Sequence, residues 1–198
     1  MKTSTFGLIM LAPMKNGRTS RLLICRAGCI GNHLSRRNMF FRPTYLIDGD
    51  ITDIDLDQLS ADGVRGLILD LDSTVVAPRS GVLTDAVASW LTQARSMFKL
   101  AIVSNNKRES YLEQVRALLD MPTIGRAAKP RRGGFRQALE KMQLQPSEVA
   151  VVGDRPLTDV WGGQRAGMRT ILVWPLKTMN EPDWIIFFRK LERLVIRS

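Results

Sequence analysis

The feature that most constrains the fold is a regular alternation of short β-rich segments with longer amphipathic ones, which begins near residue 64. Four apolar runs have the length and composition of buried strands, at 66–71, 100–104, 149–153 and 170–174. Segment 123–128 is a weaker strand candidate. Helical patterns lie between these runs, at 84–98, 111–119, 135–142 and 158–166, with Thr84 placed to cap the first. This order predicts an α/β fold, a doubly wound (Rossmann-like) parallel sheet with helices on both faces.

The first 38 residues differ in composition from the rest of the chain. The 198 residues include 29 basic and 19 acidic ones, and no acid precedes Asp48. Seven basic residues fall within 1–38, so residues 39–198 carry 22 basic against 19 acidic residues, a net charge of +3. We therefore expect a basic, disordered leader over 1–38 and one domain over 39–198. The leader resembles an organellar transit peptide, or it is sequence upstream of a true start at Met39.

The domain contains no cysteine and no histidine, which limits the chemistry that it can perform. Both cysteines and the single histidine of the chain, Cys25, Cys29 and His33, lie in the leader. A disulfide framework, a structural zinc site, a cysteine nucleophile and a Ser-His-Asp triad are therefore excluded from the domain. Its small net charge gives little support to nucleic-acid binding, and no nucleic acid is expected as a partner. Catalysis would have to use carboxylates, Lys, Arg and hydroxyls.

Polar residues directly follow three of the predicted strands, and one lysine precedes the third predicted helix. They are Asp70, Asp72, Thr74, Ser104, Asn105, Lys129, Asp154 and, five residues further on, Asp159. Loops at the carboxyl ends of parallel strands converge on one edge of the sheet, so we expect these groups to lie together.

Two acids of this set should share one crevice. Asp70 and Asp72 are alternate residues of an extended segment, and alternate side chains point to the same face. With Asp154 they would form an oxygen cluster suited to Mg²⁺. Each residue also has a plainer interpretation as a turn acid, a strand terminator or a helix cap. Their order and spacing together favour a phosphate site, in which Lys129 and Ser104 contact phosphate oxygens.

These segments resemble the four motifs of the haloacid dehalogenase-like (HAD) phosphohydrolase superfamily. The matching residues are GLILDLDSTVV at 66–76, Ser104, Lys129 and GDRPLTD at 153–159. More narrowly, residues 42–176 resemble the YqeG group of small phosphatases, which is related to phosphatidylglycerophosphate phosphatases. Ser73 stands where that group often has Asn. The resemblance suggests a protein of the cytoplasm or the plastid stroma, which could also lie peripherally at a membrane surface.

The resemblance also implies a role for each matching residue. Asp70 would be the nucleophile that forms an aspartyl-phosphate, and Asp72 would be the general acid and base. Mg²⁺ would be held by the Asp70 carboxylate, the Asp72 main-chain carbonyl and Asp154. Ser104 and Lys129 would hold the phosphoryl group. Supporting roles would fall to Thr74, Asn105 and Asp159, the last orienting Lys129 or a metal-bound water.

The spacing of the motifs leaves no room for a cap domain. Only 31 residues separate Asp72 from Ser104, and 24 separate Ser104 from Lys129. Capless members of the superfamily that the motifs resemble tend to act on large or embedded substrates, which fits a lipid headgroup. The resemblance to the group related to phosphatidylglycerophosphate phosphatases implies phosphatidylglycerophosphate, hydrolysed to phosphatidylglycerol, as the preferred substrate. The alternatives are a soluble sugar or nucleotide phosphate, or a non-catalytic phosphoacceptor or scaffold domain.

The C-terminal segment 182–197 places apolar residues at helical spacing, with basic residues among them. Packing against the sheet is the favoured interpretation, because the apolar stripe has the ordinary width for a globular helix. Ile186 and Phe187 lie off that stripe, and Trp184 and Phe188 accompany them. Peripheral membrane contact through this helix is the alternative.

Overall fold

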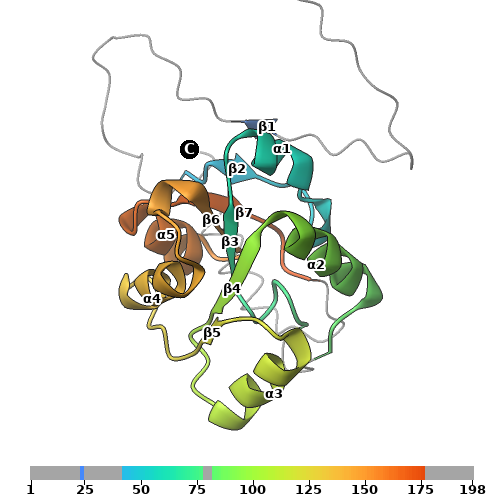
Figure 1. Ribbon diagram of the computed structural model, residues 1–198, viewed down its shortest axis with the longest axis vertical. Helices are drawn as coiled ribbons and strands as arrows, with labels where there is room; N and C mark the ends of the chain where they lie inside the picture. The colour runs from blue at the N-terminus through green and yellow to red at the C-terminus, as the bar shows by residue number, and fades with distance from the viewer. Residues whose placement is uncertain (1–22, 25–41, 78–81, 177–198) are drawn as a thin grey trace, which may run out of the picture.

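The computed structural model describes residues 23–24, 42–77 and 82–176 (Figure 1). Its strands are β1 (Leu23–Ile24), β2 (Tyr45–Leu46), β3 (Gly66–Leu69), β4 (Lys99–Val103), β5 (Thr123–Ile124), β6 (Val149–Gly153) and β7 (Arg169–Leu172). They form one sheet in the order β1-β2-β7-β6-β3-β4-β5. The six strands from β2 to β5 are parallel, and β1 pairs with β2 in the antiparallel sense at the edge. The predicted doubly wound parallel sheet is confirmed.

The helices cover both faces of this sheet. They are α1 (Leu56–Ala61), α2 (Asp85–Met97), α3 (Glu109–Leu119), α4 (Gly133–Met142) and α5 (Trp161–Arg165), with short turns at η2 (Ile51–Asp53), η3 (Pro146–Glu148) and η4 (Pro156–Val160). The Thr84 hydroxyl caps α2 by accepting a hydrogen bond from Val87 N at 3.3 Å. The predicted helix over 158–166 is instead a π-helical turn, η4, followed by the short helix α5.

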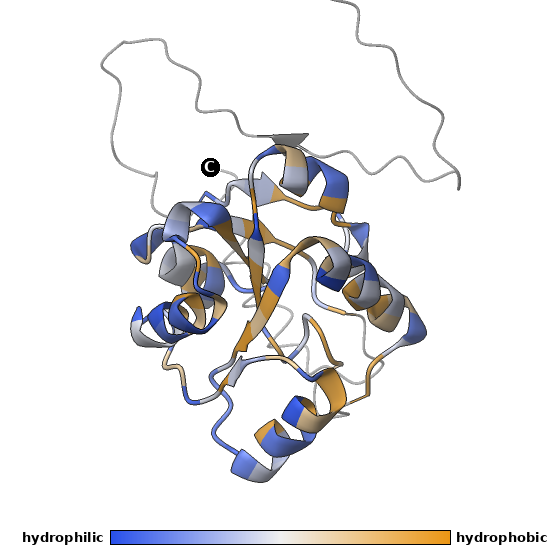
Figure 2. Ribbon diagram, viewed as in Figure 1, coloured by the Kyte–Doolittle hydropathy of each residue, from blue (hydrophilic) through white to orange (hydrophobic). Residues whose placement is uncertain are grey.

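Alternate residues of the central strands face two separate cores. Leu67 and Leu69 of β3 belong to the core covered by α1, α2 and α3, whereas Ile68 between them packs in the core under α4. Figure 1 accordingly shows α4 and α5 on one side of the strands and α2 on the other. In Figure 2 the central strands are largely hydrophobic, as a sheet buried on both faces requires. Within the described residues, each crossover between the motif-bearing strands holds a single helix and no cap domain.

The segment before residue 64 contains elements that hydrophobic periodicity did not predict. Strand β2 has only two residues, and α1 has six, so neither is long enough to show a period. Side-chain caps hold this segment instead. Asp50 accepts a hydrogen bond from Thr52 N at 2.9 Å, and Asp55 accepts one from Gln58 N at 2.9 Å.

Two predictions concern residues that are mostly not described. Apart from β1, the leader lies outside the described residues, as does the C-terminal segment 182–197 with Trp184, Phe187 and Phe188. None of the helices in the described part of the chain is long and apolar enough to cross a bilayer.

Candidate active site

The carboxyl ends of two neighbouring strands, β3 and β6, bring three of the predicted acids together. Asp70 follows β3, and its backbone N–H donates to Val152 O of β6 at 2.9 Å. Asp154 directly follows β6, and Asp159 lies in η4 just beyond it. All three are buried, with 8%, 1% and 1% of their surface exposed. The sheet therefore gathers these carboxylates at one edge, as the strand order requires.

Lys129 joins two of these acids. Its ammonium group donates to Oδ1 of Asp70 and, at 2.7 Å, to Oδ1 of Asp159. Burial raises the pKa of Asp70 to about 6, although the charge of Lys129 opposes this rise. Burial also disfavours the Lys129 ammonium, but the charges of Asp159 and Asp70 outweigh it and hold the pKa of Lys129 above its usual range. Lys129 therefore remains a buried cation at the centre of the site.

The acid cluster has the donor set of a metal site. Asp70, Asp154 and Asp159 each offer a carboxylate oxygen, and these oxygens lie within 4.8 Å of one another. Three carboxylates and the one ammonium of Lys129 give this buried group a formal charge of −2. A divalent metal ion would neutralise it, and all its protein ligands would be the oxygens that hard cations prefer. Asp159 thus joins the cluster, whereas the carboxylate of Asp72 is not one of the three.

A glycine is required beside this cluster. A Cβ atom added to Gly153 would lie 2.4 Å from Cγ of Asp159, closer than real contacts allow. Asp159 also accepts a hydrogen bond from Arg155 N at 3.2 Å, so its side chain folds back against the end of β6. The Gly-Asp pair that ends β6 therefore serves two purposes, because Gly153 makes room for Asp159 while Asp154 supplies a carboxylate.

The loop after β4 holds Lys129 through its backbone. Asn105 accepts a hydrogen bond from Lys129 N at 2.6 Å and donates one to Lys129 O at 3.2 Å. Ser104, with 1% of its surface exposed, accepts a hydrogen bond from Asn106 N at 3.0 Å through Oγ. Thr74 is also buried, and its hydroxyl has no hydrogen-bond partner among the described residues. The structure therefore places Asn105 as a support for Lys129.

Asp72 lies beside the cluster and is held by two residues that were not predicted for the site. Its Oδ1 accepts a hydrogen bond from the Tyr111 hydroxyl at 3.1 Å, and its Oδ2 accepts one from Asn106 Nδ2 at 3.3 Å. Sequence analysis assigned Tyr111 only to the buried face of a helix. Asn106 belongs to the polar run after β4, which was the one available sign of its role.

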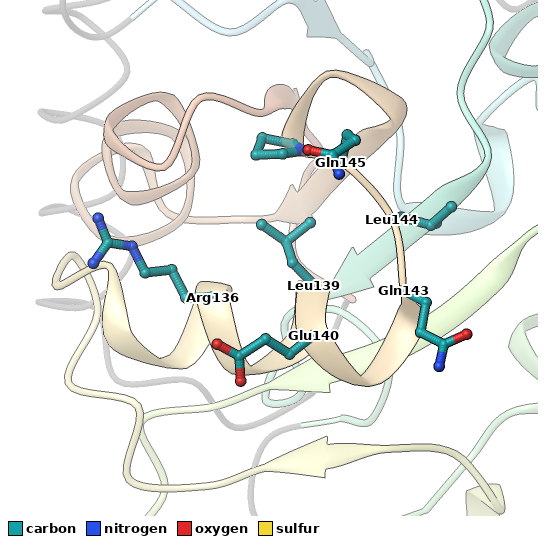
Figure 3. Close-up of a pocket in the computed structure, with 7 residues that line it drawn as sticks. Arg136, Leu139, Glu140, Gln143, Leu144 and Gln145 are labelled. Carbon is teal, nitrogen blue, oxygen red and sulfur yellow. The ribbon is translucent and has the colours of Figure 1, made fainter.

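A surface pocket lies well away from these groups. It is formed by the last turns of α4 and the segment that leads to β6, and its lining includes Arg136, Leu139, Gln143, Leu144 and Gln145 (Figure 3). Because β6 starts there, the pocket is at the amino edge of the sheet, opposite the acid cluster. The acid cluster, rather than this pocket, carries the chemistry.

Most of this chain is similar in sequence to known proteins. A family model described as HAD-hydrolase-like matches residues 126–180. The chain is 34% identical over 162 residues to the probable phosphatase YqeG of Bacillus subtilis, an alignment that covers 80% of this chain and 91% of YqeG. A haloacid dehalogenase-like family hydrolase from Streptococcus pneumoniae superposes with a TM-score of 0.46 at 14% identity, covering 64% of this chain and 98% of that one.

Plant and algal relatives are more distant. Phosphatidylglycerophosphate phosphatase 1 of Arabidopsis thaliana is 26% identical over 157 residues, which cover 75% of this chain and 45% of that protein. The Chlamydomonas reinhardtii protein of the same name is 29% identical over 160 residues, covering 75% of this chain and 58% of its own. This chain thus spans about half the length of these two relatives.

The similarity to YqeG, which extends over most of both chains, shows the family. The chain belongs to the HAD-like hydrolases. Within that superfamily it is a phosphatase related to YqeG, with a buried cluster of three aspartates that suits a divalent metal ion.

Proposed function

We propose that the protein is a Mg²⁺-dependent phosphomonoester hydrolase that works through an aspartyl-phosphate, and that its substrate is phosphatidylglycerophosphate. The observation that carries the reaction type is the arrangement after β3. Asp70 is bonded to the buried ammonium of Lys129, and Asp72 follows two residues later with its carboxylate outside the metal cluster. One carboxylate can therefore attack phosphorus while the other transfers a proton.

In the first step, an Asp70 carboxylate oxygen attacks phosphorus. The bond between phosphorus and the alcohol oxygen breaks, its electron pair goes to that oxygen, and Asp72 supplies the proton that makes it a neutral alcohol. Lys129 neutralises charge on the transferring phosphoryl group, and the buried Ser104 hydroxyl donates to one of its oxygens. Asn105 keeps Lys129 in place through hydrogen bonds to the backbone N–H and C=O of Lys129.

In the second step, Asp72 takes a proton from water and the resulting hydroxide attacks the phosphorus of the aspartyl-phosphate. The bond between phosphorus and Asp70 breaks, which releases inorganic phosphate and restores the Asp70 carboxylate. Mg²⁺ bound at Asp70, Asp154 and the Asp72 main-chain carbonyl, with Asp159 alongside, would supply positive charge to the phosphoryl oxygens.

Two observations support an anionic lipid as the substrate. The first is the similarity to two proteins named as phosphatidylglycerophosphate phosphatases. The second is a set of six exposed basic residues on the loops that follow β4, β5 and β6, namely Lys107, Arg108, Arg126, Arg131, Arg132 and Arg155. These loops contain one acid, Asp154, and it is buried. The exposed charges on these three loops are therefore all positive, which favours a substrate at an anionic membrane.

A soluble sugar phosphate is the second candidate. The chain is 29% identical over 109 residues to N-acylneuraminate-9-phosphatase of Mus musculus, covering 51% of this chain and 44% of that enzyme. This similarity spans half of the chain. The name of the mouse enzyme indicates that its substrate is a sugar phosphate.

A comparison of rates on three substrates distinguishes the two candidate functions. Rates are measured on phosphatidylglycerophosphate in mixed vesicles, on N-acylneuraminate 9-phosphate and on p-nitrophenyl phosphate, each with MgCl₂ and with EDTA. We expect Mg²⁺-dependent turnover of all three and the highest kcat/KM on the lipid. Faster turnover of the sugar phosphate would overturn the lipid assignment, and equal rates in EDTA would overturn the metal requirement.

Charge variants test the positive loops. Arg131→Gln with Arg132→Gln should lower kcat/KM on the vesicles about thirtyfold, since each of the two basic residues contributes roughly 1 kcal/mol near a bilayer, and should spare p-nitrophenyl phosphate. The matched control is Arg65→Gln with Lys141→Gln, which removes the same charge from exposed positions near the amino edge. If both pairs have the same effect, the substrate does not dock on the positive loops.

A further inference from the structure

We propose that Tyr111 and Asn106 are positioning residues that aim the Asp72 carboxylate at the oxygen of the leaving alcohol. This inference rests on the proposed function, because it requires Asp72 to be the proton donor. Among the described residues, the Tyr111 hydroxyl donates to Asp72 Oδ1 at 3.1 Å and Asn106 Nδ2 donates to Oδ2 at 3.3 Å. Together the two donors fix the plane of the carboxylate, and each oxygen keeps a further acceptor site for a proton.

Asn106 is itself held in one orientation. Its Oδ1 accepts a hydrogen bond from Arg108 N at 3.0 Å, and a backbone N–H can only donate. The amide nitrogen of Asn106 must therefore face Asp72. The backbone of Asn106 is fixed as well, since its N–H donates to Ser104 Oγ at 3.0 Å and its carbonyl accepts from Arg126 N at 3.0 Å. Because these hydrogen bonds fix both the backbone and the side chain of Asn106, its amide is pre-organised to donate to Asp72.

Tyr111 is held from the other side of the site. It lies in the first turn of α3, its ring packs against the core that α2 shares with β3 and β4, and the residue is half-buried. A tyrosine hydroxyl is ordinarily protonated at neutral pH, so it can donate this hydrogen bond to Asp72. Asp72 is thus clamped between a helix and a loop, both of which belong to the core domain.

The clamp should matter most when the leaving group is poor. An alkoxide must be protonated as it departs, whereas p-nitrophenolate leaves readily without a proton. Loosening Asp72 would therefore slow the first step on alkyl phosphates and leave it almost unchanged on p-nitrophenyl phosphate. The ratio kcat/KM reports this first step, because it covers events up to the release of the alcohol.

The test compares ethyl phosphate, phenyl phosphate and p-nitrophenyl phosphate in the full-length Mg²⁺-loaded enzyme. We expect Tyr111→Phe, and separately Asn106→Ala, to lower kcat/KM about tenfold on ethyl phosphate and less than twofold on p-nitrophenyl phosphate. Tyr45→Phe is the matched control. Tyr45 is the other tyrosine of the chain, and its hydroxyl also donates to a carboxylate, Asp62 Oδ2 at 2.7 Å, near the start of β3 and away from the site. The Tyr45→Phe variant should leave kcat/KM on all three substrates unchanged.

Asp72→Asn separates failure of this inference from failure of the proposed function. If Asp72→Asn shows no dependence on the leaving group, Asp72 is not the proton donor and the proposed function fails. If Asp72→Asn shows the dependence but Tyr111→Phe and Asn106→Ala behave like Tyr45→Phe, the positioning inference fails. An equal loss on all three substrates, or a loss that follows a lower unfolding temperature, would mean a structural role and would also overturn it. In the Asp72→Asn background, Tyr111→Phe should cause no further selective loss.

Discussion

Replacing Lys129 with Met should destabilise the fold more than any exposed charge replacement. Lys129→Met keeps the length and apolar stem of the side chain and removes the ammonium that bonds Asp70 and, at 2.7 Å, Asp159. At an effective dielectric constant of about 20, a pair at this distance attracts by about 6 kcal/mol, against which several kcal/mol of desolvation per ion must be set. Because the variant leaves buried carboxylates without this cation, we expect it to lose about 3–5 kcal/mol of unfolding free energy.

The matched control is an ion pair of almost the same length on the surface. Arg116 contacts Glu109 at 2.6 Å, with 40% and 50% of the two side chains exposed. Arg116→Met should cost less than about 1 kcal/mol, because water screens this pair. Urea unfolding of metal-free protein at pH 7, compared at a common m-value, measures both variants. If Lys129→Met loses no more than Arg116→Met, the buried network does not stabilise the fold and its assigned electrostatics are wrong.

The pH dependence of the same variant has a definite sign. The pKa of Asp70 is already raised to about 6 in the folded protein, and removing Lys129 removes a cause that lowers it. The folded variant then binds more protons than the unfolded chain above about pH 4, so its stability must fall as pH rises through that window. Lys129→Met should therefore regain stability between pH 7 and pH 5, and MgCl₂ should restore part of it at pH 7. A loss of stability on acidification over this range would contradict the assigned burial of Asp70.

Three further results are expected. Asp70→Asn should fold with a wild-type circular dichroism spectrum and show no turnover, because an amide cannot attack phosphorus; a substantial residual rate in the folded variant would exclude Asp70 as the nucleophile. At 100 times its dissociation constant, Mg²⁺ should add about 2.7 kcal/mol of stability to the wild type, measured as a higher unfolding temperature, and Asp154→Asn should abolish that increment; an unchanged increment would place the metal elsewhere. Deleting residues 1–38 should preserve folding and kcat/KM, because the described part of this segment contributes only the two-residue edge strand β1, and a loss of activity in the truncated protein would show that the leader has a function.

The sheet could be predicted because its signals are local. Each central strand is a continuous apolar run, and the acids that follow β3 and β6 meet because parallel strands end at a common edge. The contact between Lys129 and Asp159 has no such local signal. It joins residues 30 apart, and only the resemblance of the motifs to a known superfamily suggested it.

The elements that escaped prediction lack such signals. Strand β2 is too short to show alternation, and its place beside β7 depends on pairing with residues more than 120 positions away. The bond between Tyr111 and Asp72 spans 39 residues and depends on how the first turn of α3 is rotated against the end of β3. Helical periodicity correctly placed Tyr111 on the inner face of α3, but it cannot show whether the hydroxyl at the edge of that face meets solvent or a carboxylate.

The loop after β4 connects the two halves of the proposed chemistry. Asn105 forms hydrogen bonds with the backbone of Lys129. The next residue, Asn106, donates a hydrogen bond to the carboxylate of Asp72. Consecutive residues in an extended loop point in opposite directions, so one loop can reach Lys129, the proposed phosphoryl-binding residue, on one side and Asp72, the proposed proton donor, on the other. With no cap domain among the described residues to close over the substrate, the core must supply this alignment itself. A shift of this loop would misalign charge neutralisation and proton transfer together, so its two asparagines should tolerate substitution less well than their exposure to solvent suggests.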